Sequence, residues 1–153
     1  MTSNRRAAPY RPKPRDEVAR NMSAIRSAGN AIEGELARAL HRLGYRYRKY
    51  VKELPGRPDI VFVRQRVAVF VDGDYWHARL LRERGLAALK RYFKPSQRAY
   101  WIPKFLRRVE RDTEVNKELR SLGWKVVRLW ESDVEKKLGR AARKVATVLT
   151  RRA

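Results

Sequence analysis

Carboxylates and one histidine lie close together in the middle of the chain, around two short apolar runs. The stretch 54–77 reads LPGRPDIVFVRQRVAVFVDGDYWH. Asp59 stands directly before the first run, and Asp72, Asp74 and His77 follow the second. Carboxylate oxygens bind Mg²⁺, and a histidine that titrates near neutral pH can exchange a proton with water or a leaving oxygen. Together these residue types suit metal-dependent hydrolysis.

Each of these residues also has a structural interpretation. Asp59 follows a proline in a tight turn, where an aspartate stabilises the turn or pairs with Arg57. His77 can hydrogen-bond its own loop. The patterns G-x-S-x-G, G-x-x-x-x-G-K and G-x-G-x-x-G do not occur in the sequence, which argues against serine-hydrolase, Walker A and dinucleotide sites. The pattern alone leaves catalysis and structure as alternatives.

A β-hairpin is predicted to carry these groups. The runs 60–63 and 67–71 are rich in β-branched residues and are bounded by turn-forming residues. Asp59 is then at the start of one strand, and the other acids and His77 lie just past the end of the second.

Helices are predicted before the hairpin, over 16–27 and 31–43. Asn30 and Glu33 have the spacing of a capping box, so Glu33 has a structural interpretation, as a cap of the second helix. Gly44 ends the second helix. Aromatic and basic residues alternate over 45–52, which favours a first strand, although the same residues could contact DNA.

The C-terminal half is predicted to add two helices and a strand. Residues 78–92 have a helix-like pattern that is broken by Gly85 and then interrupted over 93–96, so 78–100 is interpreted as an excursion or loop. Pro103 is interpreted as the start of a helix that ends before Gly123. A strand over 124–130 follows, and Ser132 opens the last helix in a capping box. The predicted order α-α-β-β-β-α-β-α indicates an α/β fold, with a small mixed sheet covered by helices.

The composition points to a polyanionic partner. The 153 residues include 38 Lys and Arg against 16 Asp and Glu, a net charge of +22. Nucleic acid is the first candidate and a membrane surface the second. No run approaches the roughly 18 apolar residues of a spanning helix. The chain has no cysteine, which excludes disulfides and cysteine-based zinc sites. We expect an intracellular, cytoplasmic protein.

A basic arm is predicted over 1–15, ahead of one folded domain over 16–153. Arg5, Arg6, Arg11 and Lys13 in this arm suit phosphate contacts, and a tail for solubility is the alternative.

Three motifs, in order, carry a family resemblance. PGRPDIVF is followed by VFVDGDYWH and then by VERD and LGWKVVRLWE. From about Asn21 to Glu131 the chain resembles the very-short-patch-repair (Vsr) endonucleases. The resemblance implies the three-layer fold of the PD-(D/E)XK restriction endonucleases. It also implies a Mg²⁺-dependent enzyme that nicks duplex DNA at T:G mismatches. A homing or restriction-type enzyme on matched DNA, or a DNA-binding module without catalysis, are the alternatives.

The resemblance also implies roles for individual residues. Asp59 is expected to bind the catalytic Mg²⁺, for which Mn²⁺ can substitute, and the backbone carbonyl of Val71 is a second ligand. Glu33 is expected to hold a metal-bound water, and His77 to act as general base or acid. Asp112 is expected to support the site.

Two departures from the family pattern concern metal binding. The family holds a structural zinc with cysteines and a histidine, and Asp74, Arg79 and Ser132 occupy those places here. We therefore expect no structural zinc, and packing or ion pairs to hold residues 74–100. Asp72 replaces a family histidine and is a candidate for a further metal ligand or a phosphate contact.

Four residues match family positions that wedge between DNA base pairs. They are Met22, Tyr75, Trp76 and Trp101, and burial in the protein is the alternative for them. The expected partner is double-stranded DNA bound by a monomer, with no small-molecule cofactor and no membrane.

Overall fold

The structure, a computed structural model, describes residues 31–74 and 76–151, and at positions 76 and 77 it describes the backbone alone. The predicted basic arm, the helix over 16–27, the Asn30 cap, the boundary between 1–15 and 16–153, and the wedge residues Met22 and Tyr75 lie outside the described residues.

Four strands form one mixed sheet in the order β1-β2-β3-β4. They are β1 (Arg48–Lys49), β2 (Ile60–Phe62), β3 (Val67–Asp72) and β4 (Lys125–Trp130). Neighbours pair antiparallel except β3 and β4, which are parallel. The predicted hairpin is confirmed. The first strand is shorter than the alternation over 45–52 suggested, because Tyr50 adopts a positive φ of 52° that bends the chain out of the ladder.

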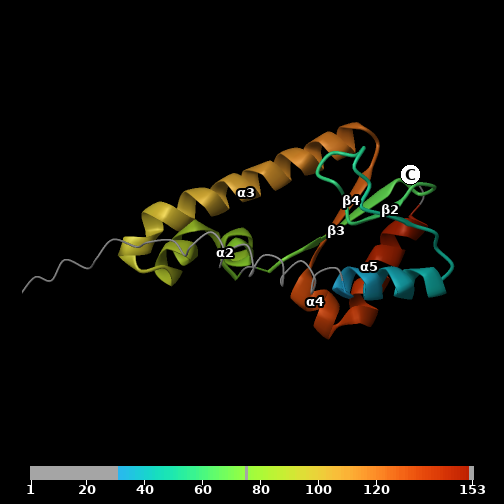
Figure 1. Cartoon of the computed structure of the whole chain (residues 1–153), viewed down its shortest axis with the longest axis horizontal. Coiled ribbons are helices and arrows are strands. Elements are labelled where there is room, and N and C mark those ends of the chain that lie inside the picture. Colours follow the sequence, from blue (N-terminus) through green and yellow to red (C-terminus); the bar gives the residue numbers. More distant parts are fainter. Residues whose placement is uncertain (1–30, 75, 152–153) are drawn as a thin grey trace, which may run out of the picture.

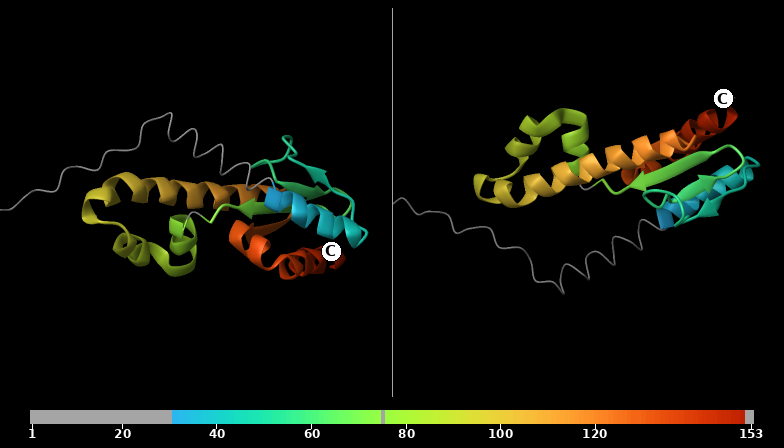
Figure 2. Two further views of the ribbon diagram at one scale, coloured as in Figure 1. Left: turned by 60° about the horizontal axis from the view of Figure 1, so that its bottom comes forward. Right: turned by 90° about the horizontal axis from the view of Figure 1, so that it is seen from above.

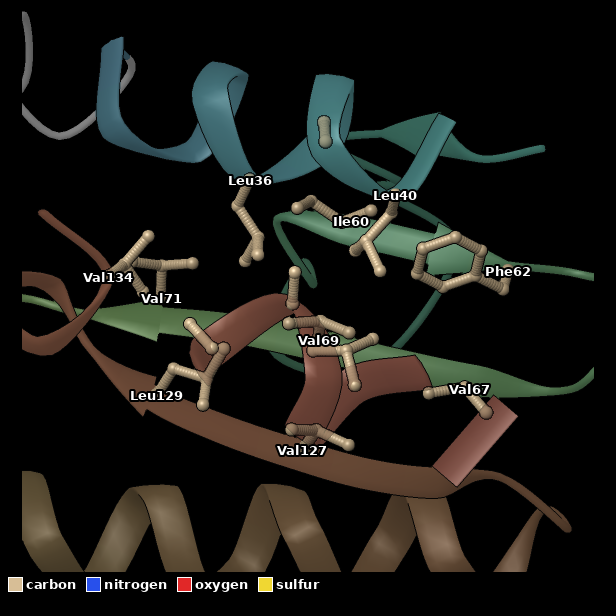
Figure 3. Packing of buried hydrophobic residues seen from close by; sticks show 14 of the residues in the cluster. Leu36, Leu40, Ile60, Phe62, Val67, Val69, Val71, Val127, Leu129 and Val134 are labelled. Carbon is tan, nitrogen blue, oxygen red and sulfur yellow. The ribbon is translucent and has the colours of Figure 1, made fainter. Parts of the chain in front are cut away.

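Helices cover both faces of this sheet (Figure 1). Residues 31–42 are helical, and the other helices are α2 (Trp76–Tyr92), α3 (Pro95–Ser121), α4 (Glu131–Lys136) and α5 (Leu138–Thr150). The 31–42 helix and α5 pack on one face, where alternate residues of β2, β3 and β4 point into the main core (Figure 3). On the other face, α3 packs against Ala68 and Phe70 through Leu119. The predicted three-layer α/β architecture is confirmed.

An arm formed by α2 and α3 extends beyond the sheet (Figures 1 and 2). Its apolar cluster is separate from the main core and consists of Ala78, Leu81, Leu89, Phe93, Ile102 and Phe105. Residues 78–100 leave the main core as the predicted excursion, but the loop alternative was wrong, since most of this stretch is helical. The predicted break at Gly85 is confirmed, since that residue has φ 84° and ψ 179° inside α2.

Two predicted helix starts were also wrong. Helix α3 begins at Pro95 and continues through Pro103. Only the short turn at residues 93 and 94 separates it from α2, so the earlier proline takes the first-turn position that suits proline. Helix α4 begins at Glu131 without a side-chain cap, and the final helical stretch breaks at Lys137 (φ −136°, ψ 57°). Ser132 does not cap this helix, because its hydroxyl hydrogen-bonds Asp74.

The hairpin brings the beginning of β2 and the end of β3 to one edge of the sheet. The Asp59 N–H donates to the Val69 carbonyl at 3.0 Å, which places Asp59 one step outside the β2 ladder and beside the last residues of β3. Among the described residues no helix is long and apolar enough to cross a membrane.

Candidate active site

Two carboxyl groups from different elements meet at this edge. Glu33 lies on the 31–42 helix with only 7% of its surface exposed, and Asp59 precedes β2. One Asp59 oxygen, Oδ2, accepts the Val71 N–H at 2.8 Å. The two carboxyl groups lie within hydrogen-bonding reach of each other. The Tyr50 hydroxyl donates to Oε2 of Glu33 at 2.8 Å.

Burial raises the pKa values of both carboxyl groups. Burial, followed by the charge of Glu33, raises the pKa of Asp59 to about 7, although the Val71 N–H opposes the change. Burial also raises the pKa of Glu33, against the hydrogen bonds from Tyr50 and Asp59 and the charge of Lys49. Two carboxylates in contact cannot both ionise without a cation between them or near them. The pair therefore holds a proton or binds a positive ion.

The donor atoms at this position fit Mg²⁺. Mg²⁺ prefers oxygen ligands, keeps several waters, and is usually held by one or two carboxylates. Asp59 and Glu33 supply these carboxylates. In a strand the N–H and C=O of one residue point the same way, so the Val71 carbonyl is directed to the side on which Asp59 lies. Among the described side chains of residues 31–74 and 78–151, no group of three or more His, Cys, Asp or Glu is placed so that it could hold a metal ion.

A hollow of about 260 Å³ lies between the sheet and α3, with Asp59 in its wall. Asp72 and Asp112 also line it, together with the cationic side chains of Arg111 and Arg128. The mixture of carboxylates and guanidinium groups suits a phosphate held beside a metal ion, because guanidinium groups bind phosphate oxygens directly.

Ion pairs within the protein occupy Asp72 and Asp112. Arg82 of α2 pairs with Asp72 at 3.1 Å and also with Asp112 of α3. Arg128 of β4 pairs with Asp72 at 3.1 Å and lies 3.8 Å from Asp112. A supporting role for Asp112 agrees with these contacts. The metal-binding role of Asp72 stays a prediction, and its two arginine partners do not favour it.

The other predicted site residues differ in how far the structure describes them. Trp76 and His77 begin α2, directly after the loop that follows β3, and the roles of their side chains stay predictions. Trp101 is half-buried in the arm and stacks on Phe93 and Phe105 with ring centroids 6.3 and 6.1 Å away. This packing agrees with the burial alternative for Trp101, and its role as a wedge in DNA stays a prediction.

A cluster of polar side chains joins the start of α2 to the start of α4, and three of its members are the residues that the resemblance matched to the family's zinc ligands. We call Asp74, Arg79, Ser132 and Asp133 the Arg79 cluster. Arg79 donates to Asp74 at 2.9 Å and to the Ser132 hydroxyl at 3.1 Å, and it pairs with Asp133 at 3.2 Å. The Ser132 N–H donates to Asp74 at 2.7 Å. The prediction that ion pairs hold this region is confirmed.

The pKa of Asp74 reflects this cluster. Burial alone would raise the pKa, but hydrogen bonds from the hydroxyl and N–H of Ser132 and from Arg79 outweigh burial and lower it. Asp74 therefore acts in the cluster as a carboxylate, which keeps its ion pair with Arg79 at neutral pH.

Sequence reasoning missed Tyr50 and Arg128. Tyr50 was assigned to an alternating strand, but its N–H donates to the Asp59 carbonyl at 3.2 Å and its hydroxyl reaches Glu33. Pairing the first predicted strand with the hairpin would have placed it opposite Asp59. Arg128 alternates with the buried residues Val127 and Leu129 of β4, and this could have marked it as a charged residue on the face opposite the main core.

Comparison with known proteins agrees with this geometry. The family described as DNA mismatch endonuclease Vsr matches residues 10–82. The type II nicking enzyme V.NmeDIP of Neisseria meningitidis serogroup C is 40% identical over 124 residues, which cover 81% of this chain and 80% of the relative. The type II nicking enzyme V.NaeI of Lentzea aerocolonigenes is 42% identical over 74% of this chain and 67% of its own length. DNA mismatch endonuclease Vsr of Escherichia coli (strain K12) is 35% identical over 73% of this chain and 67% of its own length. Extended similarity of this kind, together with the carboxyl pair on a three-layer α/β core, shows that the chain belongs to the Vsr family and is a DNA endonuclease.

Proposed function

We propose that this endonuclease uses Mg²⁺ to nick one strand of duplex DNA at T:G mismatches, as a step in very-short-patch repair. The observation that carries the proposal is the buried Glu33–Asp59 pair, whose raised pKa values indicate a place for a cation. The E. coli relative named as a mismatch endonuclease supports the choice of substrate.

The residues around the pair suit the steps of phosphodiester hydrolysis. A bound Mg²⁺ supplies a Lewis acid for the phosphate and lowers the pKa of a coordinated water. Asp59 would hold the ion and Glu33 a water bound to it, and the Tyr50 hydroxyl orients Glu33. Arg111 in the hollow beside Asp59 can balance negative charge on the phosphate.

His77 has the role of proton donor or acceptor in this proposal. It lies in the first turn of α2, three residues after Asp74, and the Arg79 cluster anchors that turn. An imidazole with a pKa near neutrality can take a proton from the attacking water or give one to the leaving oxygen.

A second candidate is nicking at matched sites. It is favoured by the two relatives that are named as type II nicking enzymes. The chemistry is the same in both cases, so only the choice of substrate separates them.

The test uses two synthetic duplexes that differ in one base pair, T:G against T:A, with a different label on each strand. Wild type is incubated with each duplex in Mg²⁺, in Mn²⁺ and in EDTA, beside His77→Ala and the surface control Glu118→Gln. We expect nicking of one strand of the T:G duplex that requires the metal, is retained in Glu118→Gln and is lost in His77→Ala.

Other outcomes decide against this proposal. Equal cleavage of both duplexes would favour the matched-site candidate. Binding without a metal-dependent product would indicate a DNA-binding module. Cleavage of both strands would contradict nicking.

A further inference from the structure

A second hollow, of about 690 Å³, lies between the start of α2, the end of β4 and the outer side of α5. We call it the α5 groove. It shares no lining residue with the hollow beside Asp59. Leu129 lines the α5 groove and belongs to the main core face, whereas the hollow beside Asp59 lies on the α3 face. The α5 groove is therefore a separate feature of the surface.

Exposed cations dominate the α5 groove. Lys137, Arg140, Arg143 and Lys144 line it, and all four are exposed. Helix α5 contains no Asp or Glu. The acid that lines the groove, Asp133, is already paired with Arg79.

These four cations lack ion-pair partners elsewhere in the described chain, 31–74 and 76–151. Arg140 lies three residues from Arg143 and four from Lys144, a spacing at which like charges on a helix repel each other. The repulsion disfavours the free protein, and a bound polyanion relieves it.

The α5 groove begins next to the candidate active site. Leu129 is the register partner of Val71, whose N–H donates to Asp59. Paired strands lie about 4.8 Å apart, and Figure 3 shows Val71, Leu129 and Val134 close together. Arg79, also in the wall of the groove, is in α2 two residues after His77. A duplex with its cleaved bond at Asp59 therefore has the α5 groove in its vicinity.

We propose that the α5 groove binds the phosphodiester backbone of the duplex that flanks the cleaved step. This rests on the proposed function in taking duplex DNA as the ligand. The groove extends from Lys137, directly before α5, to Thr147 within it, a rise of about 15 Å. One strand presents a phosphate every ~3.4 Å along the duplex axis, so on the order of four phosphates can face this length. Lysine and arginine bind phosphate without reading the base sequence.

The test measures binding of an uncleaved, fully matched duplex in EDTA over a range of salt concentrations. The variant is Arg140→Ala with Lys144→Ala. Its matched control is Lys117→Ala with Arg120→Ala, which removes the same charge from exposed positions on α3 outside both hollows. Each phosphate contact contributes about 0.9 to the slope of log affinity against log salt.

We expect the groove variant to lower this slope by about 2 and to weaken binding roughly tenfold at ~0.1 M salt, and the control to change the slope by less than about 0.5. The melting temperature of the groove variant should stay the same or rise, because repulsion is removed. Arg140→Gln with Lys144→Gln should give the same binding result and guards against a defect specific to alanine.

Equal losses in the groove variant and the control would overturn the proposal, since net charge alone would then explain the binding. No loss in either would overturn it as well. Binding in EDTA does not require nicking. A failure of the proposed reaction would therefore appear in the cleavage assay, and the binding measurement would still test the role of the α5 groove.

Discussion

Asp59 is subject to opposing influences that come from three different elements. Burial and the neighbouring Glu33 favour its protonated form, whereas the Val71 N–H favours the carboxylate. Burial and Glu33 act on Tyr50 in the same direction and raise its pKa to about 12. Tyr50 therefore remains a hydrogen-bond donor to Glu33 at any pH at which DNA hydrolysis is assayed.

The raised pKa of Asp59 predicts how the stability of the metal-free protein depends on pH. The pKa is 3.8 in its ordinary state and about 7 in the folded chain, so folding takes up a proton between these values. The stabilisation is complete below pH ~4 and is lost as pH rises through 7, with a change on the order of a few kcal/mol.

Thermal melts in EDTA at pH 5 to 8 check this prediction. We expect the melting temperature of wild type to fall over this range relative to that of Asp59→Asn. Mg²⁺ added at pH 7.5 should raise the melting temperature of wild type, because the ion binds the folded state. Parallel pH profiles for the two proteins would contradict the assignment.

Tyr50→Phe should lower the rate of nicking by roughly tenfold, because Glu33 loses the donor that orients it while the ring is kept. The hydrogen bond contributes about 1 kcal/mol to stability, so the fold should survive. Single-turnover cleavage and a thermal melt check this, with Tyr92→Phe in the arm as the matched control. A wild-type rate in Tyr50→Phe would show that Glu33 does not need this partner.

At the level of elements, the Arg79 cluster joins the start of α2 to the start of α4. Arg79 also lies over the Trp130 ring, with its guanidinium carbon 5.6 Å from the ring centroid. These contacts fix the turn of α2 that contains His77. Arg79 is therefore a positioning residue for the site.

Arg79→Ala should lower stability by about 2–3 kcal/mol, because it leaves the partly buried Asp74 without its cation. It should also reduce kcat more than KM if the turn with His77 shifts. Urea denaturation and steady-state nicking measure the two effects. Arg79→Lys should restore part of both, and Arg84→Ala on the exposed side of α2 should change neither. A loss of stability without any change in kcat would contradict the positioning role.

Gly56 holds the turn before Asp59 against α3. It has a φ of 74°, and an added Cβ would come within 2.5 Å of Val115 Cγ1. Gly56→Ala should therefore cost about 2–4 kcal/mol, from backbone strain and overpacking together.

The control for this prediction is Gly44→Ala. Gly44 has a φ of 98° but no neighbour within 4 Å of an added Cβ, so strain acts there without a clash. Chemical denaturation of both variants separates the cost of backbone strain from the cost of overpacking. Adding Val115→Ala should restore part of the stability lost in Gly56→Ala. Equal losses in the two glycine variants would show that contact with α3 does not matter.

At the scale of the whole molecule, the local sequence pattern was sufficient to predict the hairpin and the three-layer core. Two apolar runs identified β2 and β3, the alternation over 124–130 identified β4, and Gly44 and Gly123 marked helix ends correctly. The arm could not be predicted this way, because the short turn before Pro95 looked like the end of an ordered segment. Its helices are stabilised by contacts between α2 and α3 that no local window contains.

Only some residues of the site could be predicted, because others depend on contacts between distant parts of the chain. The pattern around the hairpin suggested Asp59 and the resemblance to the family added Glu33, and the structure brings the two together from separate elements. Tyr50 and Arg128 act through partners that are distant in sequence, Glu33 and Asp72. Such partnerships depend on strand order, which spacing along the chain does not reveal.

The central claim is that the Glu33–Asp59 pair holds the catalytic Mg²⁺, and the rate of nicking in Asp59→Asn tests it most directly. Asparagine keeps an oxygen that can accept the Val71 N–H but loses the charge. With saturating Mg²⁺ and a T:G duplex, we predict a single-turnover rate at least ~10³-fold below wild type, since metal-assisted catalysis supplies several kcal/mol. Binding of the duplex in EDTA should be unchanged. A rate within about tenfold of wild type would contradict the assignment of this pair as the catalytic centre.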